Sequence, residues 1–410
     1  MLFEPLKIKN KTMPNRFFAQ AMEGNDGENG GQPSERTVNR YIELAKGGWG
    51  AVQIEATSIM ESSLARINGL IINKKNLDSI KRLAESFRKH NDKACLFLQI
   101  THSGERSGPF SEIVTLTPGD PGQRSSASRY LTTDDLEKIK DSFIQAALLT
   151  EEAGIDGIDF KMCHGYLAGE MLRPSNTRED KWGGSFENRT RFLREVVGGI
   201  KSGLRSRDFI LGSRISIYEG IRGGCGTCRR GPANPWFSGP RFPSGSSGSD
   251  EIVEDLSQML DVVRTMDDLD MDFVNVSAGI PALTGAITRP TEISKHLVLH
   301  HLRYTRAVKD LIKKENRSLK VIGSAYSTYK DEAPTVMEEM LSKDYVDACG
   351  FGRQSFADPL MPKKIATGEK VNWCILCSGC AKLMIAQMND GCIVYNDYYK
   401  EVNKNYKAPK

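Results

Sequence analysis

The sequence lacks several features that would indicate particular classes of protein. It has no apolar run long enough to cross a membrane, and its first residues, MLFEPLKIKN, lack the apolar core of a secretory signal. It also has no block of like charges, and a formal net charge of +4 gives no electrostatic reason to expect nucleic acid as a partner. We therefore predict a cytoplasmic protein that binds neither membranes nor nucleic acid.

Two further absences narrow the function. No G-x-G-x-x-G sequence occurs, so nothing indicates a dinucleotide-binding Rossmann unit. Nine cysteines in 410 residues are few for a disulfide framework, and most of them stand in pairs at C-x2-C spacing. This spacing favours a metal or redox role for the cysteines.

Short apolar runs alternate with amphipathic segments along the chain, which is the pattern of βαβ units around a parallel sheet. Eight such units predict a closed (β/α)8 TIM barrel, an α/β fold that reaches 410 residues when it carries insertions. The predicted strands are Phe17–Met22, Ala51–Glu55, Cys95–Ile100, Gly157–Lys161, Phe209–Ile215, Phe273–Ser277, Lys320–Gly323 and Asp347–Phe351. The predicted helices are Glu35–Lys46, Leu77–Lys89, Thr133–Ala153, Phe186–Leu204, Glu251–Met266, Leu302–Lys314, Ala333–Lys343 and Ala357–Thr367.

Two segments lie outside this alternation. Residues 220–250 follow the fifth strand, and their Gly, Pro and Ser content predicts an insertion over the mouth of the barrel. Cys225 and Cys228 in this insertion supply only two ligands, so a zinc site, a redox pair and two unpaired thiols all remain open. We divide the chain into a barrel over residues 1–370 and a cysteine-rich C-terminal extension over residues 371–410.

The fourth strand ends in a concentration of reactive side chains. Lys161, Cys163, His164 and Tyr166 follow its last apolar residue, Phe160. Polar groups in this position are costly unless they serve chemistry, and TIM barrels carry their active sites at the carboxyl ends of the strands. This is the predicted catalytic region, with a polar connection that has no site as the alternative.

Four motifs lie in this region and beyond it. They are GYL at 165–167, PSNTREDKWGGS at 174–185, ENRTRF at 187–192 and GRQSFADPLMPKKIATGE at 352–369. Together they resemble the signature of the Old Yellow Enzyme family of NADH:flavin oxidoreductases. The nearest resemblance is to the barrel domain of members similar to 2,4-dienoyl-CoA reductase. It implies a flavoprotein, an oxidoreductase whose FMN lies across the open end of a TIM barrel.

The resemblance also implies which residues contact the flavin ring. The backbone of Ala21, Met22 and Glu23 would lie under the ring, although the family usually has Pro at the first position and Thr or Cys at the third. Glu23 would lie near the flavin carbonyl O4, with a solvated loop acid as the alternative. Gln99 offers both a donor and an acceptor to the pyrimidine edge. Arg214, in a buried strand, needs an acceptor, and in the family it faces flavin N1 and O2.

The other expected flavin contacts lie after the second, seventh and eighth strands. Ala56 is small where backbone must approach the ring closely. A phosphate between the loops after strands seven and eight is a recurrent feature of TIM barrels. Gly323 and Gly352 allow backbone N–H groups to converge there, Ser324 completes the set, and Arg353 adds a charged donor.

The resemblance implies that reduced flavin delivers hydride to an alkene conjugated to a carbonyl, carboxylate or thioester. Tyr166 would protonate the α-carbon, and Lys161 and His164 would hold the carbonyl oxygen. NAD(P)H or an electron-donor protein would supply the electrons. No histidine follows the sixth strand before His296. This absence argues against assigning to this chain the dienoyl-CoA substrate of those relatives. The oligomeric state stays open, with a homo-oligomer among the options.

Two other functions compete with this hypothesis. Lys161 at a strand end and a phosphate site also suit a lyase or aldolase that forms a Schiff base. Gln99 and Arg214 argue against it. An electron carrier or binding module built on the cysteine tail is the third hypothesis, and it would leave Tyr166 and His164 as packing residues.

The extension contains four cysteines at C-x2-C-x2-C-x11-C spacing: Cys374, Cys377, Cys380 and Cys392. Four thiolates form the ligand set of a 4Fe–4S cluster. Relatives with a cluster have C-x2-C-x3-C-x11-C here, so this chain is one residue shorter in the middle gap. A 4Fe–4S cluster, structural zinc and no metal all remain open.

Overall fold

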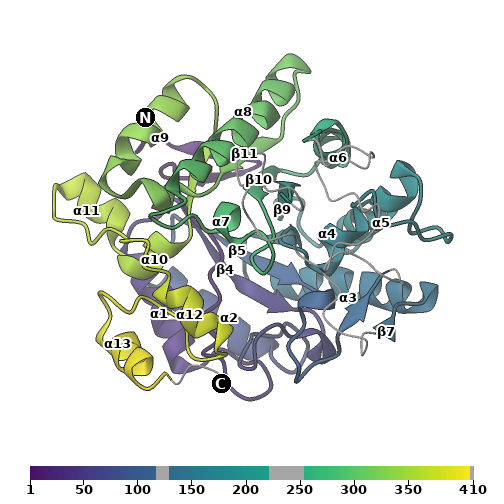
Figure 1. Ribbon diagram of the computed structural model, residues 1–410, viewed down its shortest axis with the longest axis horizontal. Coiled ribbons are helices and arrows are strands. Elements are labelled where there is room, and N and C mark those ends of the chain that lie inside the picture. The colour runs from purple at the N-terminus through teal and green to yellow at the C-terminus, as the bar shows by residue number, and fades with distance from the viewer. Residues whose placement is uncertain (117–128, 221–253, 407–410) are drawn as a thin grey trace.

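The computed structural model describes residues 1–116, 129–220 and 254–406. Eight parallel strands close into one barrel, and helices surround it (Figure 1). The predicted TIM barrel is therefore confirmed. In chain order the barrel strands are β3 Phe17–Ala19, β4 Ala51–Ser58, β5 Cys95–Thr101, β8 Gly157–Met162, β9 Ile210–Tyr218, β10 Phe273–Ala278, β11 Lys320–Gly323 and β12 Ala348–Phe351.

The helices of the barrel follow the strands in the expected alternation. They are α1 Glu35–Lys46, α2 Leu77–Arg88, α3 Thr133–Glu152, α5 Phe186–Gly203, α6 Ser257–Asp268, α8 Val298–Lys314, α9 Ala333–Ser342, α10 Arg353–Ala357 and α11 Met361–Thr367. Side chains cap several of them, as at α1, where Ser34 and Thr37 form a capping box. Apolar faces of these helices then pack on the strands in one continuous core.

Shorter elements complete the described chain. The small strands are β1 Leu6–Ile8, β2 Lys11–Met13, β6 Val114–Thr115 and β7 Arg129–Tyr130. The short helices are α4 Leu167–Met171, α7 Gly285–Thr288, α12 Gly379–Ile385 and α13 Asp397–Lys404, with 3-10 turns at Glu61–Ser63, Gly104–Arg106, Lys295–Leu297 and Tyr326–Glu332.

The barrel interior changes from apolar to polar along its axis. Phe18, Phe97 and Phe273 fill the amino end, and the Phe97 and Phe273 ring centroids lie 5.2 Å apart. The β1–β2 hairpin belongs to the same apolar cluster. Gln99 lies two residues beyond Phe97, and Asn275 two beyond Phe273, so each points the same way as its phenylalanine but nearer the carboxyl end. The amino end is therefore closed by packing, and the polar interior faces the carboxyl end.

Several predicted elements differ from the structure in their bounds; α6, for example, begins at Ser257 rather than at residue 251, and α8 at Val298 rather than at residue 302. Strand β3 ends at Ala19 rather than at residue 22, because the chain leaves the sheet there and passes under the mouth of the barrel. The predicted helix at 357–367 is interrupted at Asp358, which is extended because Pro359 follows it. The predicted insertion at 220–250, with Cys225 and Cys228, lies outside the described residues apart from its first residue.

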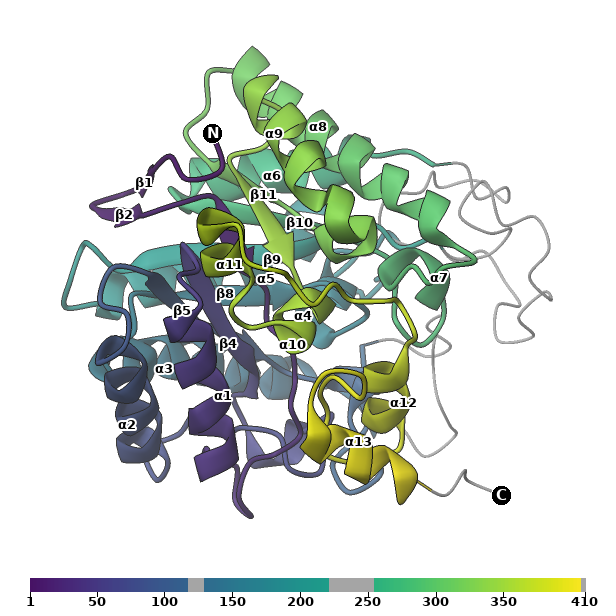
Figure 2. The ribbon, with the colours of Figure 1, turned by 90° about the vertical axis from the view of Figure 1, so that its left-hand side faces the viewer.

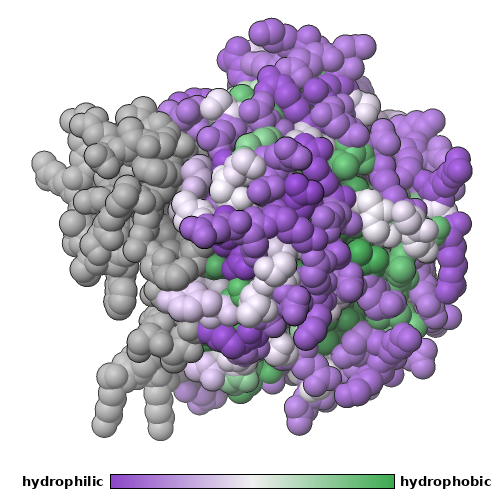
Figure 3. All heavy atoms as spheres, turned by 90° about the vertical axis from the view of Figure 1, so that its right-hand side faces the viewer, coloured by the Kyte–Doolittle hydropathy of each residue, from purple (hydrophilic) through white to green (hydrophobic). Residues whose placement is uncertain are grey.

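The segment after α11 folds back over the barrel. Helix α12 lies beside α10 (Figures 1 and 2). The loop after β3 is tied to this segment, because Asn25 Nδ2 donates to Met388 O at 3.0 Å and Asp390 N donates to Gly24 O at 2.7 Å. The face that bears α3 and α5 is mainly hydrophilic (Figure 3). In the described residues no helix is both long and apolar enough to cross a membrane.

Candidate active site

A cavity of about 540 Å³ opens at the carboxyl end of the barrel. This volume is typical of a site for a cofactor or a small molecule. Every predicted catalytic and flavin-contacting residue except Gly323 lines it: Ala21, Met22, Glu23, Ala56, Gln99, Lys161, His164, Tyr166, Arg214, Ser324, Gly352 and Arg353. A side chain at Gly323 would instead meet Tyr326, so this glycine lies behind the cavity wall.

Asp159 fixes one side of the cavity from inside the barrel. Its carboxylate accepts hydrogen bonds from the Nε2 atoms of Gln53 and Gln99, the latter at 3.2 Å, and from Arg214 N at 2.7 Å. Because Gln99 Nε2 is engaged, its Oε1 is the atom left to face a ligand. Gln53 Oε1 in turn accepts from Ala21 N at 3.1 Å. The sequence hypothesis found Gln99 but missed Asp159, which orients it.

Two arginines of the cavity wall have nitrogen atoms that lack a hydrogen-bond partner among the described residues. Arg214 Nη2 donates to Ser277 Oγ at 3.1 Å, and Arg353 Nη2 donates to Pro290 O at 2.6 Å. Arg214 Nε and Arg353 Nη1 are buried without a hydrogen-bond partner among the described residues. Buried donors of this kind are normally satisfied. A ligand with acceptors at two separated points, such as a flavin ring and its phosphate, satisfies both.

The segment after β8 turns sharply into the cavity. His164 and Gly165 both have left-handed backbone conformations, with φ of 63° and 73°. His164 N donates to Ser216 Oγ at 3.0 Å, and His164 Nε2 lies 2.9 Å from Ser277 Oγ. Burial lowers the pKa of His164 well below its usual value, and the charges of Arg214 and Lys161 lower it further. This imidazole is therefore neutral at physiological pH.

Lys161 and Tyr166 form a pair beside His164. Both are buried, and Lys161 Nζ lies 3.4 Å from the centroid of the Tyr166 ring. A cation over an aromatic ring contributes about 0.5–2 kcal/mol. The pair holds an ammonium group and a phenol at the cavity wall, where one can stabilise negative charge and the other can supply a proton.

Glu23 lines the cavity as an ionised group with a partner. Its Oε2 lies 3.1 Å from Arg66 Nη2, and only 15% of each side chain is exposed. Burial would raise the pKa of Glu23, but the charges of Arg66 and Lys161 outweigh burial and lower it. Glu23 is therefore not a solvated loop acid, which was one of its two alternatives. Arg66 compensates the charge of Glu23, and no sequence motif indicated Arg66.

His301 on α8 also lines the cavity and was missed by the sequence hypothesis. Its Nε2 lies 2.8 Å from Ile287 O, while its Nδ1 is buried without a partner among the described residues. Burial lowers the pKa of His301 to about 4, so the ring is neutral and Nδ1 is an acceptor. His301 lies more than twenty residues after the end of β10, so no sequence motif near a strand end indicated it. His102, by contrast, is not in the cavity wall, and its Nδ1 accepts from Gly104 N at 3.1 Å.

The four cysteines of the extension line a second, smaller cavity next to the first. Cys374, Cys377, Cys380 and Cys392 share it with Arg353, and Cys380 lines both cavities. Throughout the described ranges, however, no three His, Cys, Asp or Glu side chains are grouped closely enough to hold a metal ion. The four thiols therefore face one space without forming a closed ligand set.

Comparisons with known proteins extend this description. Residues 1–230 match the model of the family described as NADH:flavin oxidoreductase / NADH oxidase. The N,N-dimethylglycine/sarcosine dehydrogenase of Chromohalobacter salexigens is 34% identical over 52% of this chain and 32% of its own length. The NADH oxidase of Thermoanaerobacter brockii is 25% identical over 92% of this chain and 53% of its own length. The chain thus spans between a third and about half of these two relatives.

A solved structure gives the same fold over nearly the whole chain. The old yellow enzyme homologue from Zymomonas mobilis superposes with a TM-score of 0.68 over 97% of this chain and 99% of that one, at 18% identity. At this level of identity the likeness supports the barrel fold only.

Proposed function

Since the chain belongs to the NADH:flavin oxidoreductase / NADH oxidase family, and is thus an oxidoreductase of the Old Yellow Enzyme type, we propose that it reduces an alkene conjugated to a carbonyl, carboxylate or thioester group. The observation that carries the proposal is the Lys161–Tyr166 pair, 3.4 Å from nitrogen to ring centroid, in the wall of the cavity that Arg353 also lines. The Schiff-base alternative for Lys161 is set aside, because the family is one of flavin oxidoreductases.

FMN is the cofactor that the cavity suits. Arg353, Ser324 and Gly352 would hold its phosphate, and Gln99 and Arg214 the pyrimidine edge of its ring. The unpartnered Arg353 Nη1 and Arg214 Nε support this orientation. FMN bound there would supply hydride-transfer chemistry, with NAD(P)H as the reductant and the β-carbon of the alkene as the acceptor.

The protein's own groups prepare the substrate. Ser277 Oγ accepts from Arg214 Nη2 and lies 2.9 Å from His164 Nε2, and in the proposed arrangement its hydroxyl donates to Nε2. The neutral imidazole then carries its proton on Nδ1, as a donor for the substrate's carbonyl oxygen. Lys161 adds a positive charge near the same oxygen, where negative charge develops during the reaction. Tyr166 donates its phenolic proton to the α-carbon.

We also propose that Cys374, Cys377, Cys380 and Cys392 bind a 4Fe–4S cluster. All four line one cavity, and two residues between them, Leu376 and Ser378, have left-handed backbones with φ of 60° and 58°. Non-glycine residues in this conformation are strained and concentrate at functional sites. Iron, sulfide and zinc assays of protein purified without oxygen distinguish a cluster from zinc or no metal.

Oxidation of a methylated amine is the second candidate function. The Chromohalobacter relative is named for dimethylglycine and sarcosine, which are both methylated amines. In this reaction the amine rather than NAD(P)H would reduce the flavin. The two functions are therefore separated by testing which compound reduces the oxidised enzyme.

The two half-reactions of the anaerobic holoenzyme test the proposal. We expect NAD(P)H to reduce the flavin and an enone to reoxidise it. Tyr166→Phe should slow reoxidation by about 100-fold or more, since it removes the proton donor, and should leave reduction by NAD(P)H nearly unchanged. Equal losses in both half-reactions would contradict the role of Tyr166, and reduction by dimethylglycine but not by NAD(P)H would favour the second candidate.

A further inference from the structure

Arg289 is a cation of the cavity wall to which neither the proposed flavin contacts nor the proposed catalytic groups give a role. Arg289 follows α7 and lines the cavity wall. Its two hydrogen bonds are weak, one from Nη1 to the thioether Sδ of Met384 at 3.7 Å and one from Nη2 to Pro281 O at 3.5 Å. Among the described residues no carboxylate lies within ion-pair distance of it. A partly buried guanidinium in a cavity wall, with no carboxylate at ion-pair distance among the described residues, indicates an anionic ligand.

The two acidic residues of the cavity wall do not serve as that counter-ion. Glu23 is engaged by Arg66 at 3.1 Å. Asp390 is buried and lines the same cavity, but it forms no ion pair with Arg289. Burial lowers the pKa of Arg289, and the nearby Cys380 and Asp390 do not offset this effect, whereas Glu23 does offset it for Arg66.

Arg289 lines the same cavity as Lys161, His164 and Tyr166, and its charge acts on both His164 and Glu23. Burial lowers the pKa of His164, and the charge of Arg289 is one of those that lower it further. The same charge contributes to lowering the pKa of Glu23, against the effect of burial. A ligand group bound to Arg289 is thus close to the groups that would activate the substrate.

We propose that the substrate carries a carboxylate and that Arg289 binds it, apart from the carbonyl oxygen held at Lys161 and His164. A planar guanidinium matches a carboxylate with two parallel hydrogen bonds, which gives both affinity and orientation. The inference rests on the proposed function only in taking this cavity as the active site. The carboxylate subsite alone would serve an unsaturated acid or an amino acid, so its existence does not depend on the direction of the redox reaction.

Calorimetric titration of the holoenzyme with benzoate and benzamide tests this inference. The two probes have similar shapes and differ in charge, and calorimetry needs no flavin absorbance. We expect benzoate to bind at least about 10-fold more tightly than benzamide. Arg289→Gln should weaken the binding of benzoate about 10- to 100-fold and change the affinity for benzamide by no more than about 2-fold. Arg289→Lys should recover part of the loss. Arg82→Gln, on the exposed face of α2, is the matched control.

Four results would overturn the proposal. Benzoate and benzamide binding equally to the unmodified enzyme would show that no carboxylate subsite exists. Equal weakening of both probes by Arg289→Gln would indicate a structural role. Loss of FMN alone would assign Arg289 to the cofactor, and loss of iron alone to the cysteine site. Failure of the alkene assay with the benzoate preference intact would instead contradict only the proposed reaction.

Discussion

Asp159 accepts hydrogen bonds from Gln53 and Gln99 inside the barrel and thereby determines which atom of each glutamine faces the cavity. Its carboxylate also receives the backbone N–H of Arg214 at 2.7 Å. One buried acid thus orders the ring-binding side of the site without lining the cavity itself. Burial raises the pKa of Asp159, and these hydrogen bonds oppose the rise. The buried carboxylate therefore depends on its neighbours for hydrogen bonds that water would otherwise provide.

Asp159→Asn should weaken FMN binding about 10-fold, because an amide cannot accept from all three donors and one glutamine must turn its own amide. Fluorescence titration of the flavin-free protein with FMN measures the effect. Asp141→Asn is the control, since the Asp141 side chain is 74% exposed on α3. An unchanged affinity in Asp159→Asn would show that the orientation of Gln99 does not matter for the flavin.

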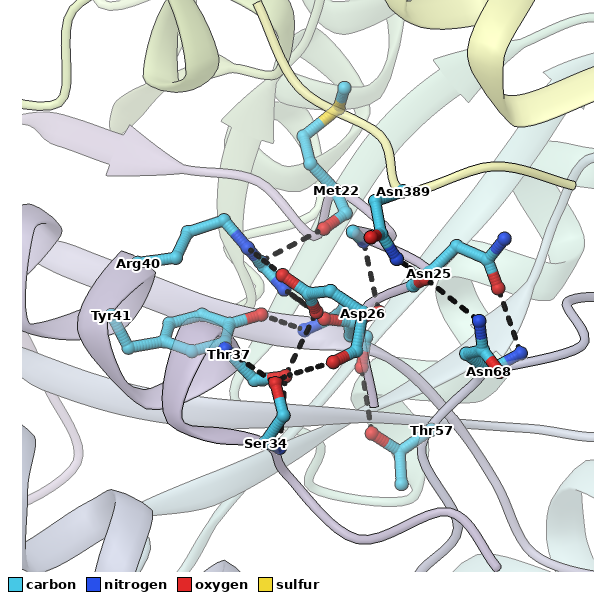
Figure 4. A network of polar contacts seen from close by, with 12 residues as sticks. Met22, Asn25, Asp26, Ser34, Thr37, Arg40, Tyr41, Thr57, Asn68 and Asn389 are labelled. Carbon is cyan, nitrogen blue, oxygen red and sulfur yellow. Dashed lines mark hydrogen bonds and ion pairs between the residues drawn. The ribbon is translucent and has the colours of Figure 1, made fainter. Parts of the chain in front are cut away.

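At the scale of elements, the loop after β3 is held from two sides. Arg40 on α1 joins it through Asp26 Oδ1 at 2.9 Å and Met22 O at 3.4 Å (Figure 4). Arg40 also pairs with Glu55 of β4, whose Oε2 accepts from Gly24 N at 3.0 Å. This network positions the backbone beneath the mouth of the barrel.

The same loop is joined to the cysteine extension. Asn389 Nδ2 donates to Asn25 O at 2.6 Å, and Asn25 Oδ1 accepts from Asn68 N at 2.8 Å (Figure 4). A helix, a strand and the extension therefore meet at the segment that carries Met22 and Glu23.

Glu55 makes this network sensitive to pH. Burial raises its pKa from 4.5 to about 7, with Arg40 opposing the shift and Asp26 adding to it. Between these two values the native state binds a proton that the unfolded state has lost, so the free energy of unfolding falls as pH rises from about 4.5 to about 7. Glu55→Gln should flatten this part of the pH profile.

Urea unfolding at several pH values from about 4.5 to about 8 measures that flattening. Glu43→Gln, at an exposed pair with Lys46 on α1, should keep the profile of the unmodified protein. If Glu55→Gln keeps it as well, the pH dependence arises elsewhere and the protonation of Glu55 plays no part in it.

At the scale of the whole molecule, the sequence was sufficient to predict the barrel, because each strand is a short buried run with turn residues around it. The polar groups at the strand ends could be placed as well, since a barrel brings the carboxyl ends of all its strands together. The break at Asp358 was missed, although Pro359 restricts the residue before it.

Residues contributed by tertiary packing could not be foreseen. Arg66, Arg289 and His301 belong to segments without a motif, and only the folded chain brings them to the cavity. For this reason the sequence did not reveal that Arg66 pairs with Glu23, and so the net charge around Glu23 could not be predicted. Motifs and strand ends therefore indicated many residues of the cavity wall, but not those that tertiary packing adds.

Titration of the flavin-free protein with FMN and with riboflavin tests the central claim most directly, namely that the cavity holds FMN with its phosphate at Arg353. We predict that FMN binds at least about 100-fold more tightly than riboflavin, and that Arg353→Met reduces this preference to less than about 10-fold. Equal affinities for the two flavins, or no binding of either, would contradict the account.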